Sequence, residues 1–105
     1  MNSLSIHHVG IAVEDLEDAS SFYRDTFGFE TAASFEVAGE AFGRGIGREY
    51  ASGDFVRLTL GDVLLELVEY ESSGRERERL DVSDPGSVHL GLECDDVRAF
   101  YDDLD

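Results

Sequence analysis

The sequence has no lysine and no tryptophan, and it has only one cysteine and one proline. All eight basic residues are arginine, against 24 aspartates and glutamates, so the formal net charge at pH 7 is -16. This charge repels phosphate groups, which excludes nucleic acid and anionic membrane surfaces as expected partners. Because the acids are scattered rather than gathered in one block, we interpret them as a solvated coat like that of proteins from salt-loving organisms.

The single cysteine, Cys94, cannot form an intramolecular disulfide, and we expect it to be a small buried residue in a strand. No apolar run reaches the roughly 18 residues of a membrane span, and the N-terminus lacks a signal-peptide pattern. The chain has 105 residues, of which 42% are hydrophobic, and this is enough for one small packed domain. The absence of a membrane-span pattern and of a signal-peptide pattern predicts a cytoplasmic protein.

Residues 5–13 alternate between large and small side chains, which predicts a strand with two different faces. One face carries two valines and an isoleucine, and the other carries His8, Gly10 and Ala12. Asp15 is a suitable N-cap for a helix that follows, and Gly28 is a typical stop signal. The chain therefore begins with a strand and a helix.

Three β-rich runs follow this helix, over residues 29–37, 55–60 and 63–70. Gly61 and Asp62 separate the last two runs and predict a hairpin. Residues 38–53 hold five glycines and predict a long irregular connection with Phe42 and Tyr50 as candidate anchors.

The opening pattern is repeated near the end of the chain. Residues 87–94 alternate like a second strand, and Asp96 can cap a second helix. His89 aligns with His8 at an offset of 81 residues, which indicates an internal repeat. We therefore predict one domain over residues 1–105, made of the segments 1–70 (first module), 71–86 (charged linker) and 87–105 (start of a second module).

The two equivalent histidines and one glutamate are the candidate functional residues. Glu66 shares its strand face with Leu64 and Val68, and a carboxylate among apolar side chains needs a counter-charge. A divalent cation held by neutral imidazoles and a carboxylate would supply one. Arg57, in the preceding strand, is interpreted as the partner of an acid, with an anionic substrate as the alternative.

Three segments resemble the vicinal oxygen chelate superfamily, which includes glyoxalase I, methylmalonyl-CoA epimerase, extradiol dioxygenases, and fosfomycin and bleomycin resistance proteins. They are HHVGIAVEDLEDASSFYRDTFGF at 7–29, GDVLLELVEY at 61–70 and SVHLGLECDDV at 87–97. The resemblance implies an α+β fold: a βαβββ module, plus the βα start of a second module, in a cupped mixed sheet or incomplete barrel around a divalent metal.

Carried over to this sequence, the resemblance implies His8, Glu66 and His89 as metal ligands, with Zn, Ni, Fe, Co or Mn equally suitable. It also makes Glu66 the candidate base, acting while loosely bound to the metal or displaced from it, with the late glutamate beyond Asp105 as the alternative. The family's fourth ligand, a late glutamate, has no counterpart before Asp105, so the second module is expected to be truncated or completed by another chain, as in a homodimer. His7 is not counted as a ligand because a regular strand turns it away from His8, and Glu69 is out of phase with Glu66.

A carboxylate at Glu66 favours a metal-dependent lyase or isomerase of the glyoxalase I type, which moves a proton next to a chelated carbonyl of a small-molecule substrate. The alternatives are a metal-free or metal-assisted binding protein of the bleomycin or fosfomycin resistance kind, and an extradiol-type dioxygenase. The substrate is left open, with Phe42 and Tyr50 as candidate specificity residues.

Overall fold

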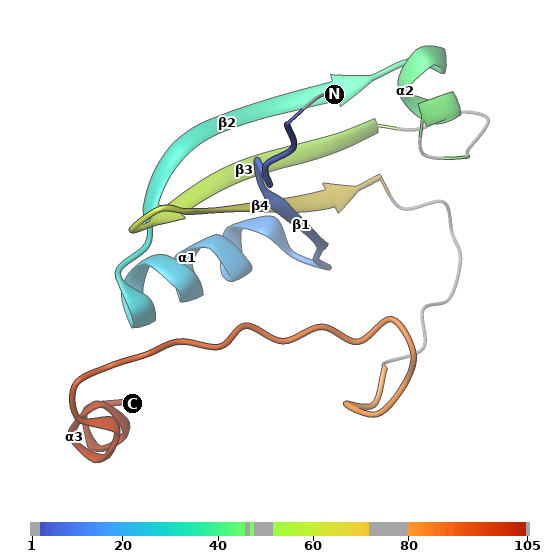
Figure 1. The fold of residues 1–105 in the computed structure, drawn as a ribbon. Coiled ribbons are helices and arrows are strands. Elements are labelled where there is room, and N and C mark those ends of the chain that lie inside the picture. Colours follow the sequence, from blue (N-terminus) through green and yellow to red (C-terminus); the bar gives the residue numbers. More distant parts are fainter. Residues whose placement is uncertain (1–2, 46, 48–51, 72–79, 105) are drawn as a thin grey trace. The chain divides into compact units, whose positions relative to one another are not determined.

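The computed structural model describes residues 3–45, 47, 52–71 and 80–104. The chain divides into two compact units, Met1–Ser72 and Ser73–Asp105, and each is described by itself (Figure 1). The first unit holds a four-stranded sheet with two helices, and the second holds the short helix α3 (Val97–Asp102). Among the described residues, no helix is long and apolar enough to cross a membrane.

The sheet of the first unit has the strand order β1-β4-β3-β2. Its strands are β1 (Val9–Ala12), β2 (Glu30–Ala38), β3 (Ser52–Leu60) and β4 (Val63–Tyr70). β1 runs parallel to β4, whereas β2, β3 and β4 form an antiparallel meander. A helix connects β1 to β2, so the predicted α+β fold with a βαβββ module and a mixed sheet is confirmed.

Helix α1 (Leu16–Phe27) begins and ends where the sequence predicts. The Asp15 side chain accepts a hydrogen bond from the Asp18 backbone N at 3.0 Å, which satisfies one of the free N–H groups of the first turn. Gly28 takes the left-handed conformation (φ 80°) and its N–H donates to the carbonyls of the last turn. These two caps fix the length of the helix that covers one face of the sheet (Figure 1).

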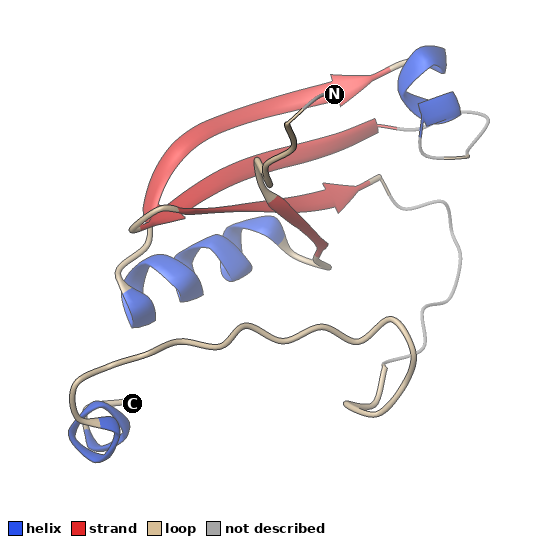
Figure 2. Cartoon of the chain, viewed as in Figure 1, coloured by secondary structure: helices blue, strands red, loops and turns tan. Residues whose placement is uncertain are grey.

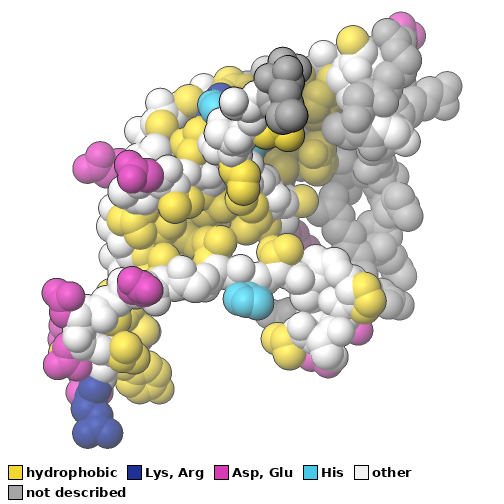
Figure 3. All heavy atoms as spheres, viewed as in Figure 1, with side chains coloured by type: hydrophobic (Ala, Val, Ile, Leu, Met, Phe, Trp, Pro, Cys, Tyr) yellow, Lys and Arg dark blue, Asp and Glu magenta, His cyan; other side chains and the backbone are white. Residues whose placement is uncertain are grey.

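The core lies between α1 and this sheet face, which we call the helix face. Leu58, Leu65 and Leu67 are at most 1% exposed, and burial of each such side chain contributes about 1.5–3 kcal/mol. Phe29 and Val56 complete the buried cluster, and α1 packs against it with four partly buried residues: Leu16, Ala19, Tyr23 and Phe27. Further hydrophobic side chains gather over α1 on the visible surface (Figure 3).

The turn between β3 and β4 sets the register of the functional residues. Gly61 has a φ of 59°, and the two-residue turn pairs Leu60 with Val63. The same register places Arg57 directly opposite Glu66. Because paired residues point to the same side of a sheet, these two charged side chains share the face opposite α1.

The structure corrects several predicted elements. The first strand begins at Val9 rather than at residue 5. A short helix, α2 (Glu40–Gly45), lies in the connection predicted to be irregular, because Phe42 packs against the aromatic rings of the sheet. Phe42 is thus an anchor of this connection, whereas Tyr50 lies outside the described residues.

The strand predicted over residues 87–94, at the start of the second module, is wrong, and the segment is drawn as a loop in Figure 2. Alternation can specify two faces, but a strand also needs a neighbour for its backbone hydrogen bonds, and no described residue pairs with this segment. Cys94 is exposed, so the prediction of a buried strand cysteine is also wrong. The helix predicted after Asp96 is present as α3, and the Asp96 side chain accepts a hydrogen bond from the Ala99 backbone N at 3.0 Å.

Candidate functional site

The face of the sheet opposite α1 carries the candidate site, and we call it the site face. Its residues alternate with those of the core: Phe55, Arg57, Glu66 and Val68 lie here, while their neighbours in sequence point to α1. β1 contributes only small residues beside them, because Gly10 pairs with Glu66 and Ala12 with Val68. The side chains of β1 on this face are therefore limited to a hydrogen atom at Gly10 and a methyl group at Ala12.

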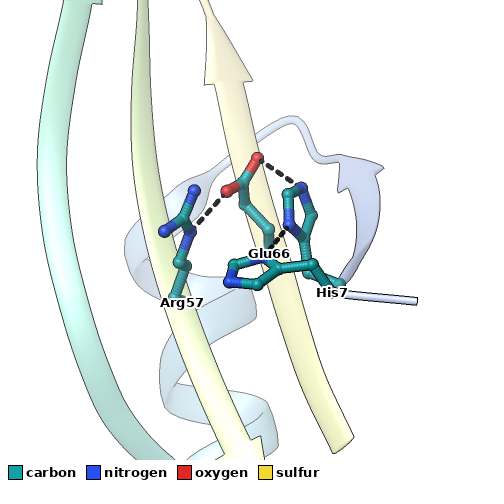
Figure 4. Close-up of polar contacts among 4 residues, drawn as sticks. His7, Arg57 and Glu66 are labelled. Atoms are coloured by element: carbon teal, nitrogen blue, oxygen red, sulfur yellow. Dashed lines mark hydrogen bonds and ion pairs between the residues drawn. The ribbon is translucent and has the colours of Figure 1, made fainter. Parts of the chain in front are cut away.

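Glu66 lies at the centre of this face and is only 8% exposed. The Arg57 Nε donates a hydrogen bond to Glu66 Oε2 at 2.7 Å. The other carboxylate oxygen, Oε1, lies 3.6 Å from His8 Nε2 (Figure 4). Arg57 and the His8 imidazole thus flank the carboxylate, one on each oxygen.

Arg57 supplies the counter-charge that the buried Glu66 requires. The acid that Arg57 was expected to pair with is therefore Glu66, on the other strand of the same hairpin. The guanidinium also lies over the Phe35 ring, 5.0 Å from its centroid. The sequence held the signal for this pair, since a two-residue turn at Gly61 and Asp62 fixes which residues face one another. The prediction did not use this hairpin register to pair Arg57 with Glu66.

His7 is part of the same constellation, which corrects the prediction that it points away. His7 and His8 precede β1, so strand alternation does not apply to them. Their Nδ1 atoms lie 2.8 Å apart, and their rings meet edge to face at a centroid distance of 5.1 Å. Contacts therefore run without a break from Arg57 through Glu66 and His8 to His7 (Figure 4).

An aromatic wall lies beside the charged residues on the site face. Phe35 and Phe55 are cross-strand partners with stacked rings, 5.1 Å apart and 6° from parallel. Phe42 contacts Phe55 and Tyr70 with centroid distances of 5.9 and 6.2 Å. Gly53 permits this packing, because a Cβ there would lie 3.2 Å from the Phe55 ring. The site therefore combines one ion-paired carboxylate with a wall of rings.

Glu69 lies on the other side of the sheet, as its phase relative to Glu66 predicts. Its Oε1 accepts a hydrogen bond from the Leu16 backbone N at 2.8 Å. A carboxylate at this position satisfies a free N–H of the first helical turn and interacts favourably with the helix dipole. Glu69 therefore anchors α1 to β4 and takes no part in the site.

Two of the three expected metal ligands come together, and their geometry suits a shared ion. Two atoms bound to one tetrahedral Zn²⁺ at 2.0–2.1 Å lie about 3.3 Å apart, and His8 Nε2 and Glu66 Oε1 are 3.6 Å apart. This spacing exceeds a hydrogen bond but suits two ligands of one cation. His89 belongs to the second unit, and within the described ranges no three His, Cys, Asp or Glu side chains form a metal-binding group.

Comparison with known proteins supports the fold and the motifs. Residues 5–105 match the model of the Glyoxalase/Bleomycin resistance protein/Dioxygenase superfamily. A 2-epi-5-epi-valiolone epimerase from an Actinomyces species is 33% identical over 101 residues, which cover 92% of this chain and 55% of that protein. The chain thus spans about half the length of this curated relative.

A solved structure of a glyoxalase family protein from Bacillus cereus superposes with a TM-score of 0.80 at 21% identity, covering 97% of this chain and 70% of that one. At this identity the likeness supports the fold alone. The family match covers nearly the whole chain and coincides with the βαβββ module and both histidine motifs. This chain therefore belongs to the glyoxalase/bleomycin resistance protein/dioxygenase superfamily.

Proposed function

We propose that this chain is a divalent-metal-dependent enzyme of the glyoxalase type, an isomerase or lyase that moves a proton at a carbon next to a carbonyl group. One observation carries the proposal: the buried Glu66 carboxylate presents Oε1 to His8 Nε2 at 3.6 Å, while Arg57 holds its other oxygen. The epimerase among its relatives favours the isomerase branch over the lyase branch.

His8, Glu66 and His89 would hold the metal, with Zn, Ni, Fe, Co and Mn all compatible with two imidazoles and a carboxylate. A divalent ion bound there would supply positive charge for a substrate carbonyl oxygen. Arg57 fixes the orientation of the Glu66 carboxylate, so that Oε1 faces His8 and the proposed ion. The Glu66 side chain is only 8% exposed, so little of it is open to water.

Glu66 acts as the base in this proposal. While loosely bound to the ion or displaced from it, its Oε1 would accept the proton from the carbon next to the carbonyl, and the electron pair of the broken C–H bond would move toward the carbonyl oxygen. Delivery of a proton from water to the same carbon, on the other side, and loss of the proton on Glu66 to water complete an epimerisation with no net change in composition. The reaction needs no oxidant or reductant, and a fixed carboxylate next to the carbon is its main requirement.

The substrate is proposed to be a small ketone, since the relative's name denotes one. The wall formed by Phe35, Phe55, Phe42 and Tyr70 would contact the carbon skeleton, while Arg57 and the imidazoles face its oxygens. The homodimer and the cytoplasmic location stay predictions from the sequence.

The test combines metal binding with hydrogen exchange. Titration of the full chain with Zn²⁺ is expected to load about one ion per chain, with binding lost in His8→Ala and His89→Ala and retained in Glu69→Gln. 2-epi-5-epi-valiolone in D₂O is the probe for activity: the loaded protein should introduce deuterium next to the carbonyl, and Glu66→Gln should not. Wild-type protein that binds none of the five metals contradicts the proposal.

A metal-free binding protein is the second candidate, and one observation favours it. Because Arg57 already neutralises Glu66, the buried carboxylate does not require a metal for its charge to be tolerated. The aromatic wall and the acidic chain would then attract an aromatic or cationic ligand. Saturable binding of such a ligand to protein that binds no metal would establish this candidate instead.

A further inference from the structure

The contact between the two adjacent imidazoles has a chemical consequence for the site. A 2.8 Å separation between His7 Nδ1 and His8 Nδ1 is a hydrogen bond, and a nitrogen donor needs a nitrogen acceptor opposite it. One of the two Nδ1 atoms therefore carries a proton and the other a lone pair. Because a neutral imidazole carries one N–H, this choice also decides the state of His8 Nε2.

We propose that His7 is a positioning residue that accepts the hydrogen bond from His8 Nδ1–H and thereby keeps a lone pair on His8 Nε2. The second contact of His8 supports this direction. His8 Nε2 and Glu66 Oε1 are 3.6 Å apart, longer than an N–H···O hydrogen bond, so this contact competes less well than the 2.8 Å bond to His7 for the one proton of the neutral ring. The short bond to His7 does hold a proton, on His8 Nδ1.

The orientation of the His8 ring agrees with this assignment. Turning the ring over by 180° would replace both contacting nitrogens with carbons and would lose the bond to His7 and the approach to Glu66. His7 thus selects both the tautomer and the rotamer of His8. Glu66 is held in the same way from the other side, since Arg57 occupies its Oε2.

Two lone-pair atoms, His8 Nε2 and Glu66 Oε1, then face the same point between them. A cation at that point would be held by both atoms, and a metal-ligating histidine ordinarily donates its other N–H to a fixed acceptor. In this chain the acceptor is a second histidine rather than a carboxylate or carbonyl. The inference rests on the proposed metal-binding role of His8, but the tautomer itself can be measured without metal.

The first measurement is a long-range ¹H–¹⁵N spectrum of the metal-free full chain at about pH 8, where imidazoles are ordinarily neutral. The chain has three histidines, so His8→Ala and His89→Ala suffice to assign the signals. We expect His8 to show a protonated Nδ1 and an unprotonated Nε2. In His7→Phe, which keeps a ring but has no acceptor, this tautomer should be lost, and in His7→Asn, which restores an acceptor, it should return.

The second measurement is Zn²⁺ affinity of the same variants. His7→Phe should weaken binding about tenfold or more, the usual effect of removing the partner of a ligating histidine, and His7→Asn should recover most of it. A proton on His8 Nε2 in the wild-type chain overturns the inference, and so does a His8 tautomer or a Zn²⁺ affinity that is unchanged in His7→Phe. If the wild-type chain binds no metal yet shows the expected tautomer and its loss in His7→Phe, the proposed enzyme fails while the role of His7 in fixing His8 stands.

Discussion

The two faces of the same four strands are built on different principles. The helix face has an apolar centre of Leu58, Leu65 and Leu67 that α1 covers, and these three leucines contribute by burial and close packing. The site face alternates with it residue by residue, yet its centre is an ion pair, Arg57 with Glu66. The helix face therefore stabilises the fold, and the site face uses that rigidity to hold charged groups in a fixed geometry.

The largest expected effect is on the helix face. Leu67→Ala removes a side chain that is 0% exposed, so the free energy of unfolding should fall by about 2–5 kcal/mol. Leu64 lies beside Glu66 on the site face and is only half-buried, so Leu64→Ala should lower the free energy of unfolding clearly less. Urea denaturation of both variants measures the difference, and equal losses would contradict the division between the two faces.

The next largest effect is expected from removing Arg57, which neutralises the charge of Glu66. Arg57→Gln leaves a carboxylate that is 8% exposed without its ion-pair partner, and we expect a loss of about 1–3 kcal/mol in the free energy of unfolding. Arg24→Gln is the matched control: among the described residues, Arg24 bonds to the hydroxyls of Thr31 and Ser21, at 3.3 and 3.4 Å, and its substitution should cost less.

The same variant links stability to the proposed metal. If an ion binds between His8 and Glu66, Zn²⁺ should stabilise Arg57→Gln more than the wild-type chain, since the ion replaces the missing positive charge. Thermal unfolding with and without Zn²⁺ measures this difference. A shift of the same size in both proteins would mean that Arg57 and the metal do not share Glu66.

The third prediction concerns the aromatic wall. Gly53→Ala would place a Cβ 3.2 Å from the Phe55 ring and 3.3 Å from Val68, so the rings must move and stability should fall by about 1 kcal/mol. Gly91→Ala, where no atom lies within 4 Å of the added Cβ, should be neutral or slightly stabilising. A neutral Gly53→Ala in thermal unfolding would show that the wall adapts freely.

The sequence was sufficient for features that depend on local chemistry. Asp15 and Gly28 delimit α1, Gly61 and Asp62 define the hairpin, and alternation places Glu66 on one face with Leu64 and Val68. Features that depend on a partner were not predictable in the same way. The position of His7 depends on where β1 ceases to pair with β4, and the segment 87–94 has the pattern of a strand without a pairing strand among the described residues.

The smallest expected effect concerns Glu69, whose carboxylate accepts a hydrogen bond from the first turn of α1. Two terms oppose each other in Glu69→Gln: loss of charge at the helix N-terminus costs about 0.3–1 kcal/mol, and relief of repulsion with its cross-strand partner Asp54 returns a similar amount. The net change in the free energy of unfolding should therefore lie within about 0.5 kcal/mol of zero. Glu69→Ala also removes the acceptor for the Leu16 N–H and should cost about 1 kcal/mol. Neither variant should alter Zn²⁺ affinity, because the sheet itself separates Glu69 from Glu66, and a weakened affinity would show that the two faces are coupled through β4.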